Sequence, residues 1–183
     1  MRKLVASFFI SLDGVVEAPQ NWHFPYFNDE MGAVIGEAIA ASDAFLVGRR
    51  TYEEWAAYWP TEAAAASPMA AMMNATPKHV VSRTLDRVEW QNSTLVEGNL
   101  ATAVTELKAR PGKNIGISGS ATLVRSLLEV GLVDELRLLV HPLVVGAGAR
   151  LFENGTPPVS LELAAAEAFS SGVVDFTYRP VPA

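Results

Sequence analysis

Short apolar runs occur at intervals along the first two thirds of this chain, and each run predicts a buried β-strand. The runs cover residues 4–10, 43–48, 78–82 and 115–117. The first run is apolar at nearly every position, which is typical of a central strand that is covered on both faces of a sheet. Each run ends in, or is followed by, glycine or serine, so a tight turn is expected after each strand.

Between these runs, apolar residues recur every three or four positions, as one buried face of a helix requires. The spacing predicts helical segments at residues 28–39, 49–55, 62–75, 99–110 and 121–130. Asn28 and Asn99 stand at N-cap positions, and Gly131 stands where a helix commonly ends.

The last third of the chain carries mostly strand patterns. We expect a long strand over residues 133–145, a flexible turn with a short helix over 146–152, and strands at 159–168 and 173–179 joined by a hairpin turn. Alternating strands and helices followed by consecutive strands predict an α/β fold. It forms a single domain, residues 1–183, with a mainly parallel central sheet, helices on both faces and antiparallel C-terminal strands.

Composition narrows the possible partners. A net charge of −6 argues against nucleic-acid binding, and no apolar stretch approaches the roughly 20 residues that span a bilayer. The chain has no cysteine for disulfides, and its N-terminus continues into the first strand without a small-residue cleavage site. We therefore expect a cytoplasmic protein. His23 has no partner at metal-ligand spacing, and no metal site is predicted.

Residues suited to phosphate follow three of the predicted strands, at Gly48-Arg49-Arg50-Thr51, Ser82-Arg83-Thr84 and Ser118-Gly119-Ser120. Arginine forks match phosphate oxygens, and free N–H groups at a helix start attract anions. Ligands of open α/β sheets bind at the carboxyl ends of the strands, so a dinucleotide would meet all three groups. The arginines favour NADP over NAD. Each group also has an ordinary explanation as a capped helix, a surface charge or a turn.

A loop over residues 16–28, termed the aromatic loop, is rich in rings. The rings either cap the core or line a pocket for a flat apolar ligand, and the pattern leaves both open. As pocket residues we single out Trp22, Phe24 and Phe27, with Trp55 from a later helix. Asp29 follows the loop, either as a favourable charge at a helix start or as a proton relay.

Six short segments occur in a recognisable order over nearly the whole chain. They are Ser11-Leu-Asp-Gly14, Val47-Gly-Arg-Arg-Thr-Tyr52, Val81-Ser-Arg83, Ile117-Ser-Gly-Ser120, Leu132-Val-Asp-Glu-Leu-Arg-Leu138 and Pro142-Leu-Val-Val-Gly-Ala-Gly-Ala-Arg-Leu-Phe152. The ordered set resembles the dihydrofolate-reductase-like superfamily, in particular stand-alone relatives of the reductase domain of riboflavin biosynthesis. This resemblance implies a dihydrofolate-reductase fold and an NADPH-dependent reductase.

The resemblance also implies roles for individual residues. Phosphates of NADPH would meet Gly48, Arg49, Arg50 and Thr51, and the adenosine 2′-phosphate would meet Ser82 and Arg83. The pyrophosphate would lie by Gly116, Ser118, Gly119, Ser120 and Ala121, and the nicotinamide by Asp13 and Gly14. Asp13 and Asp29 are the candidate catalytic residues, because hydride transfer to a C=N or C=O carbon also needs a proton.

Two departures from these relatives concern the substrate. No lysine or arginine occurs between residues 4 and 48, or between Thr51 and Pro77, where the resemblance implies cations for a ribose phosphate or a glutamate tail. We therefore expect a flat, mostly neutral heterocycle such as a pteridine or aminopyrimidine. The alternative is a nucleotide-, flavin- or drug-binding module on the same fold without turnover. A homodimer through residues 136–145 and the terminal strands is compatible with either.

Overall fold

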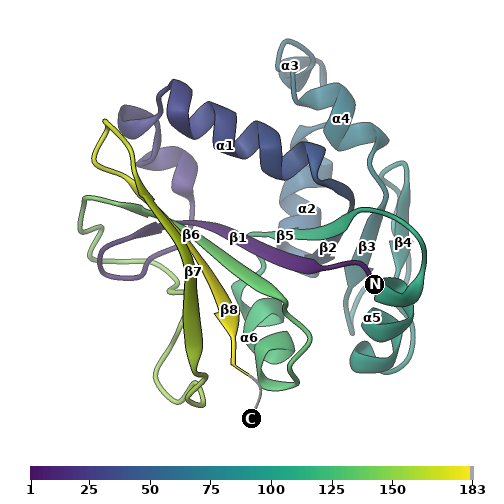
Figure 1. Ribbon diagram of the computed structural model, residues 1–183. Helices are drawn as coiled ribbons and strands as arrows, with labels where there is room; N and C mark the ends of the chain where they lie inside the picture. Colours follow the sequence, from purple (N-terminus) through teal and green to yellow (C-terminus); the bar gives the residue numbers. More distant parts are fainter. Residues whose placement is uncertain (182–183) are drawn as a thin grey trace.

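The computed structural model describes residues 1–181 and places one eight-stranded sheet between two layers of helices (Figure 1). The strand order is β4-β3-β2-β5-β1-β6-β8-β7. The strands from β4 to β6 are parallel, and β8 runs antiparallel to both β6 and β7. The predicted α/β class and the antiparallel C-terminal strands are therefore confirmed.

The strands are β1 Leu4–Ser11, β2 Ser42–Gly48, β3 Lys78–Val81, β4 Ser93–Leu95, β5 Asn114–Ser118, β6 Glu135–His141, β7 Leu161–Ala168 and β8 Val174–Pro180. β1 pairs with β5 on one side and β6 on the other, so it is central, as its apolar pattern predicts. The sequence pattern misses β4, because three residues are too few to show a period of two.

The helices are α1 Asp29–Ala40, α2 Arg49–Tyr58, α3 Glu62–Ala65, α4 Ala70–Ala75, α5 Leu100–Ala109 and α6 Ala121–Glu129. The first four lie on one side of the sheet, termed the α1 face, and α5 and α6 on the other, termed the α6 face (Figure 1). The predicted caps form: Asn28 Oδ1 accepts from Met31 N at 3.0 Å, and Asn99 Oδ1 from Thr102 N at 3.1 Å. The alanine-rich segment forms two helices, because Pro68 interrupts it.

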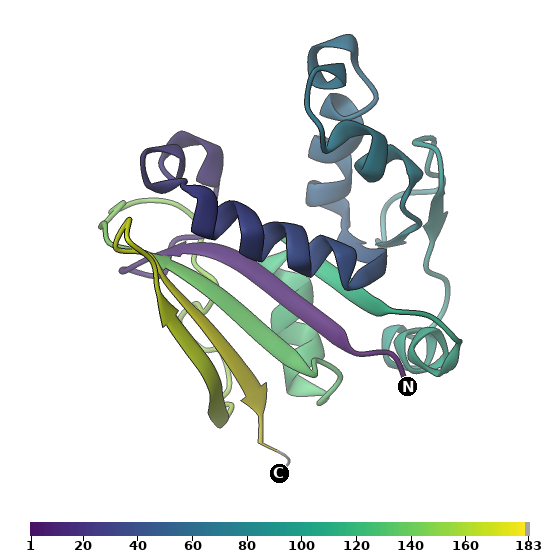
Figure 2. The same cartoon turned by 45° about the horizontal axis from the view of Figure 1, so that its top comes forward.

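Alternate residues of β1 serve opposite faces of the sheet. Leu4 and Phe8 point to the α6 face, where they join Leu127 of α6 in the main apolar core. Phe9 points to the α1 face and packs near Met31 of α1. Figure 2 shows α1 lying across the middle of the sheet, with α2, α3 and α4 grouped toward β3. No helix within residues 1–181 is long and apolar enough to cross a membrane.

The strand predicted over residues 133–145 is shorter than expected, and the short helix predicted within 146–152 does not form. β6 ends at His141 because Pro142, the next residue, has no N–H group for the ladder. The chain after it takes a different course from the one that its apolar pattern predicts.

Residues 142–151, termed the return segment, pair with the turn after β1 instead. Val16 N donates to Ala149 O at 3.0 Å, and Val15 forms an antiparallel bridge with Arg150. The segments that follow β1 and β6 therefore meet at the carboxyl edge of the sheet.

Candidate functional site

The three phosphate-suited groups lie along one edge of the sheet. They follow β3, β2 and β5, which are parallel and stand next to one another in that order. Parallel strands place their carboxyl ends at the same edge of the sheet. The groups therefore come together, although Gly48 and Ser118 are 70 positions apart in the sequence.

A hydroxyl pair joins the starts of α2 and α6. Thr51 Oγ1 accepts hydrogen bonds from the Ser120 N–H at 3.1 Å and from the Ser120 hydroxyl at 2.9 Å. The Ser120 hydroxyl oxygen in turn accepts from the Gly48 N–H at 2.9 Å. Thr51 is buried, so its hydroxyl positions the two helices and is not free for a phosphate.

Neither helix start is capped by a side chain. Gly48 precedes α2 and has no side chain, and the hydroxyl of Ser120, which precedes α6, is bonded to the neighbouring segment. The first N–H groups of α2 and α6 therefore lack a side-chain acceptor. Two such helix starts side by side provide N–H donors and partial positive charge, the combination that binds a pyrophosphate.

Gly119 allows the two helix starts to approach each other. Its φ of +64° lies in the left-handed region, which residues with a Cβ atom rarely adopt. A Cβ atom at this position would lie 3.0 Å from Thr51 Oγ1. The Ser118-Gly119-Ser120 turn therefore needs glycine for both its conformation and its contact.

The arginines along the edge differ in whether another side chain already pairs with them. Arg49 pairs with Glu53, one helical turn later, at 2.9 Å. Arg50 and Arg83 are exposed, and neither has a side-chain hydrogen bond or ion pair within residues 1–181. Ser82 shapes the turn that carries Arg83, because its hydroxyl oxygen accepts from the Thr84 and Leu85 N–H groups. Arg50 and Arg83 are the cations best placed for a phosphate.

Gly116 does not belong to this group. It lies in the middle of β5 beneath the ring of Phe45, where an added Cβ atom would stand 3.2 Å from Phe45 Cδ1. A close aromatic contact, and not a bound phosphate, explains the glycine. Ser118 and Ala121 do lie at the edge, as the last residue of β5 and the first of α6.

The Asp13 carboxylate ties the turn after β1 to the return segment. It accepts hydrogen bonds from the Ser11 hydroxyl at 2.6 Å, Val145 N at 3.0 Å and Gly146 N at 2.9 Å. The Ser11 hydroxyl, followed by the Val145 N–H, lowers the pKa of Asp13 to about 2. Such a carboxylate is a poor proton donor at neutral pH, so these contacts favour a positioning role.

Asp13→Asn is expected to destabilise the protein at neutral pH but not in strong acid. A carboxyl whose pKa is lowered from 3.8 to about 2 stabilises the fold above pH 3.8, and this stabilisation is lost as the pH falls toward 2. Urea unfolding at pH 7, 4 and 2.5 should show that the difference in free energy of unfolding between wild type and variant becomes smaller as the pH falls. Asp86→Asn, at an exposed aspartate, is the control. An equal difference in free energy at all three pH values would contradict the prediction.

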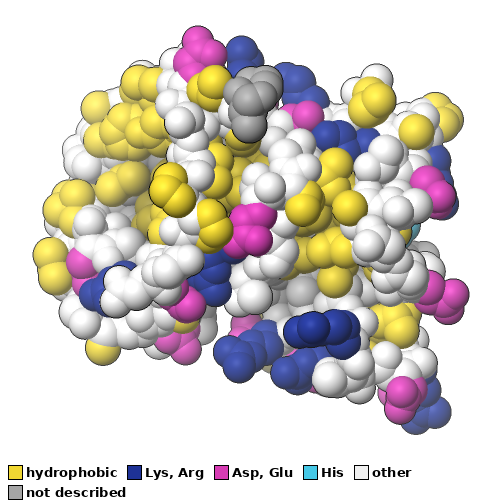
Figure 3. All heavy atoms as spheres, turned by 90° about the horizontal axis from the view of Figure 1, so that it is seen from below, with side chains coloured by type: hydrophobic (Ala, Val, Ile, Leu, Met, Phe, Trp, Pro, Cys, Tyr) yellow, Lys and Arg dark blue, Asp and Glu magenta, His cyan; other side chains and the backbone are white. Residues whose placement is uncertain are grey.

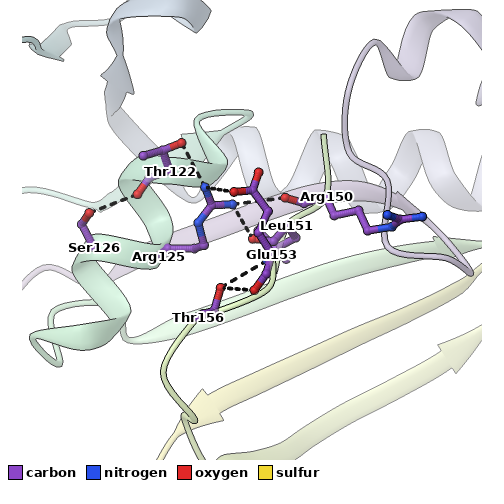
Figure 4. Close-up of polar contacts among 7 residues, drawn as sticks. All are labelled: Thr122, Arg125, Ser126, Arg150, Leu151, Glu153 and Thr156. Carbon is purple, nitrogen blue, oxygen red and sulfur yellow. Dashed lines mark hydrogen bonds and ion pairs between the residues drawn. The ribbon is translucent and has the colours of Figure 1, made fainter. Parts of the chain in front are cut away.

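Arg125 and Arg150 hold the return segment in place. Neither arginine has a role that was predicted from the sequence. Arg125 of α6 donates to the Arg150 and Leu151 carbonyls at 3.2 and 3.0 Å and pairs with Glu153 (Figure 4). The Arg150 side chain points away from α6 (Figure 4), and its Nε donates to the Asp13 carbonyl at 2.7 Å. These partners are 25 or more residues apart, so no local pattern could reveal them.

Arg150 brings a guanidinium to the turn after β1, where its Nη2 lies 3.6 Å from the Asp13 carboxylate. Its aliphatic stem lies over Gly14, whose φ is +83°, and its guanidinium is half-exposed. The absence of lysine and arginine from residues 4–48 therefore does not leave this end of the site without a cation. The loop that Arg150 belongs to supplies it from the far end of the sequence.

Three of the four rings predicted to form one pocket gather around His23 and His141, and the fourth does not. Trp22 lies edge-on to His141, with ring centroids 5.2 Å apart. Phe24 and Phe27 lie 4.2 and 6.2 Å from the ring of His23, although they are 63% and 49% exposed. Trp55 packs on Phe45 of β2 at 5.6 Å. Two strands, β5 and β1, separate β2 from β6, so Trp55 stands apart from the aromatic loop.

Asp29 is the exposed first residue of α1. Its neighbour Glu30 is held by Ser170 of the β7–β8 turn, whose N–H and hydroxyl donate to its carboxylate at 2.8 and 2.5 Å. Within residues 1–181 the Asp29 side chain makes no such bond. Of the two carboxylates at this helix start, Asp29 is therefore the one that no donor within residues 1–181 holds in place.

A groove of about 1030 Å³ lies between α2 and residues 84–91. Three carboxylates, those of Glu53, Asp86 and Glu89, face it beside Arg87. This lining disfavours phosphate, so the edge of the sheet remains the candidate site.

Comparison with known proteins agrees with this geometry. A family model described as the RibD C-terminal domain matches residues 2–174. Uncharacterized protein YyaP of Bacillus subtilis (strain 168) is 30% identical over 183 residues, which cover 97% of this chain and 95% of the relative.

Two solved structures share the fold. A pyrimidine reductase-like protein from Corynebacterium diphtheriae is 16% identical with a TM-score of 0.71, covering 100% of this chain and 93% of that one. Dihydrofolate reductase from Enterococcus faecalis, complexed with NADP(H), is 13% identical with a TM-score of 0.63, covering 98% and 97%. The fold is the dihydrofolate-reductase-like one that the sequence predicts.

Proposed function

The chain belongs to the RibD C-terminal domain family, and from this premise we propose that it is an NADPH-dependent reductase. Its substrate is a flat heterocyclic molecule, such as a pteridine or aminopyrimidine, with a C=N or C=O carbon that accepts hydride. The observation that carries the proposal is the pair of uncapped helix starts joined through Thr51 and Ser120. This pair is built for a pyrophosphate.

The residues present fit NADPH along the carboxyl edge. The pyrophosphate lies against the N–H groups at the starts of α2 and α6, and the 2′-phosphate meets Arg50 and Arg83. The nicotinamide lies toward Gly14, where the Asp13 junction and Arg150 shape the turn. NADPH supplies the hydride, and the protein orients the reactants and excludes water.

Consumption of NADPH across a panel of pteridines and aminopyrimidines tests the proposal directly. Turnover of one member, with NADPH much preferred to NADH, supports it. Tight binding of NADPH without consumption by any member would instead favour the binding module. Failure to bind either nucleotide would contradict the reductase proposal and leave a flavin- or drug-binding module.

Arg50→Ala and Arg83→Ala are each expected to weaken NADPH binding by about tenfold or more and to leave NADH binding unchanged. A charge-assisted hydrogen bond to phosphate contributes about 1.5–3 kcal/mol. Arg49→Ala should have a smaller effect, because Glu53 already neutralises Arg49. Titrations followed by nicotinamide fluorescence provide the measurement, with Arg87→Ala, in an exposed pair with Glu89, as the control. Equal losses of affinity for NADPH and NADH would mean that these arginines do not contact the 2′-phosphate.

We also propose that the protein forms a homodimer through the α6 face of β6, β8 and β7. In register, Leu138 pairs with Phe176, and Tyr178 pairs with both Leu136 and Leu163, so one face of these strands is apolar. Figure 3 looks onto the α6 face and shows hydrophobic side chains around a hollow toward β7 and β8, at the left. No helix covers this part of the sheet (Figure 1).

Leu163→Arg is expected to convert dimers to monomers, because Leu163 is 51% exposed on this apolar face and an arginine there would have to lose its water. Sedimentation equilibrium should give twice the 19.7 kDa chain mass for the wild type and the chain mass for the variant. Val130→Arg, at a similarly exposed apolar residue after α6, should remain a dimer. A monomeric wild type would refute this interface.

A further inference from the structure

Two histidines are buried where the aromatic loop packs on the sheet. His23 of the loop is 7% exposed, and His141, the last residue of β6, is 0% exposed. His141 Nδ1 lies 2.8 Å from the Leu139 carbonyl oxygen, so Nδ1 carries the hydrogen and donates it. His141 Nε2 and His23 Nδ1 have no hydrogen-bond partner within residues 1–181. Both rings are therefore packed as neutral imidazoles.

Aromatic contacts hold the loop to the sheet around these two rings. His23 stacks on Phe9 of β1, with ring centroids 4.6 Å apart. Trp22 and Tyr26 stand edge-on to His141 at 5.2 and 5.8 Å, and the two imidazoles are 6.2 Å apart.

The backbone of this part of the loop contributes little to its attachment. The hydrogen bonds donated by residues 21–23, 26 and 27 end on carbonyls of residues 18–24, within the loop itself. The side-chain contacts around His23 and His141 therefore attach this part of the loop.

Within residues 1–181, no carboxylate pairs with either imidazole at this contact. On α1, Glu30 is bound to Ser170. On β6 and β8, Arg137 and Asp175 pair with each other at 3.0 Å. In the turn after β1, Asp13 accepts from Val145 N and Gly146 N, and Glu17 of the loop accepts from Ala149 N. Tyr26 is a further titratable neighbour, and its ring meets His141 edge-on.

Burial lowers the pKa of both histidines below the ordinary value of 6.5, and a charge on His141 lowers that of His23 further. The packed loop therefore binds fewer protons than a released loop, in which both rings reach water. By linkage, packing is fully favourable above pH 6.5 and weakens as the pH falls below it.

We propose that the aromatic loop is an acid-sensitive cover, in which protonation of His23 and His141 releases Trp22 and its neighbours from the sheet. With ordinary pKa values of 6.5 in the released state, each histidine shifts the packed-to-released ratio by up to about 30-fold at pH 5. Together they shift it by up to about 1,000-fold. The loop follows the Asp13 turn directly in the sequence.

Fluorine NMR of protein labelled with 5-fluorotryptophan tests this directly. The chain has four tryptophans, and Trp22→Phe identifies the signal of Trp22. Between pH 8 and 5, this signal is expected to move toward the position of a solvated indole while the other three stay in place. Carbon NMR of the histidine rings should show His23 and His141 titrating over the same range.

His23→Phe keeps a ring stacked on Phe9 and removes one titrating group, so the upper limit of the pH response should fall from about 1,000-fold to about 30-fold. His141→Asn keeps a donor for the Leu139 carbonyl and should act likewise. His79→Gln is the matched control, because burial also lowers the pKa of His79 but this residue lies in β3. A Trp22 signal that stays fixed to pH 5, moves only together with the other three, or responds equally in all variants would overturn the proposal.

Discussion

Gly119→Val is expected to weaken NADPH binding by about 100-fold or more while the chain stays folded. Valine at a φ of +64° is strained by roughly 1–2 kcal/mol, and its Cβ would stand 3.0 Å from Thr51 Oγ1. Relief of that contact breaks the Thr51–Ser120 hydrogen bonds and separates the starts of α2 and α6. About 2.7 kcal/mol, the loss of two well-aligned phosphate contacts, corresponds to this change in affinity.

Gly131→Val is the control, because it introduces the same backbone strain without a contact like that between position 119 and Thr51. Gly131 has a φ of +68°, but an added Cβ there meets no atom within 4 Å. Both variants should stay folded in urea unfolding, with the larger loss of stability in Gly119→Val, whereas fluorescence titration with NADPH should show weak binding for Gly119→Val alone. Equal affinities in the two variants would mean that the joined helix starts do not hold the cofactor.

Features of this fold that depend on neighbouring residues could be predicted from the sequence. The helix caps at Asn28 and Asn99 and the central position of β1 follow from residue type and local spacing. β6 was predicted too long, because the apolar run continues past Pro142 and does not reveal that the return segment pairs with Val15 and Val16.

In the candidate site, too, features that depend on local sequence could be predicted, and contacts between distant residues could not. The groups after β2, β3 and β5 could be predicted to meet, since parallel strands share a carboxyl edge. The bond between Thr51 and Ser120 joins residues 69 positions apart, and nothing near Thr51 reveals it. Gly116 shows the opposite error, because a glycine near a phosphate-suited turn serves the ring of Phe45 instead.

The charge of the substrate pocket is a further case. Little positive charge is expected around the turn after β1 from the sequence, because residues 4–48 lack lysine and arginine. Arg150 reaches this turn across 137 positions and fixes its Nε on the Asp13 carbonyl. The exposed part of its guanidinium can meet a carbonyl or acidic group, so the set of test heterocycles should include rings that carry such groups.

Asp29→Asn is expected to lower reductase turnover by about 100-fold or more while changing NADPH affinity by less than about threefold. A positioned acid or base contributes about 10²–10⁴-fold to a proton-transfer step. Asp29 is exposed at the first position of α1, and within residues 1–181 its carboxylate has no hydrogen-bond partner. Asp13, held ionised by three donors, is the weaker candidate for the proton.

Glu30→Gln is the matched control for Asp29→Asn. Both variants remove one negative charge from the first turn of α1, so both lose a similar favourable interaction with the helix dipole. The Glu30 carboxylate is held by Ser170, which lowers its pKa and makes it a poor proton donor. Turnover measured with the same heterocycle should therefore fall in Asp29→Asn and change little in Glu30→Gln. Equal turnover in wild type and Asp29→Asn would remove Asp29 from the mechanism and leave an ordered water as the source of the proton.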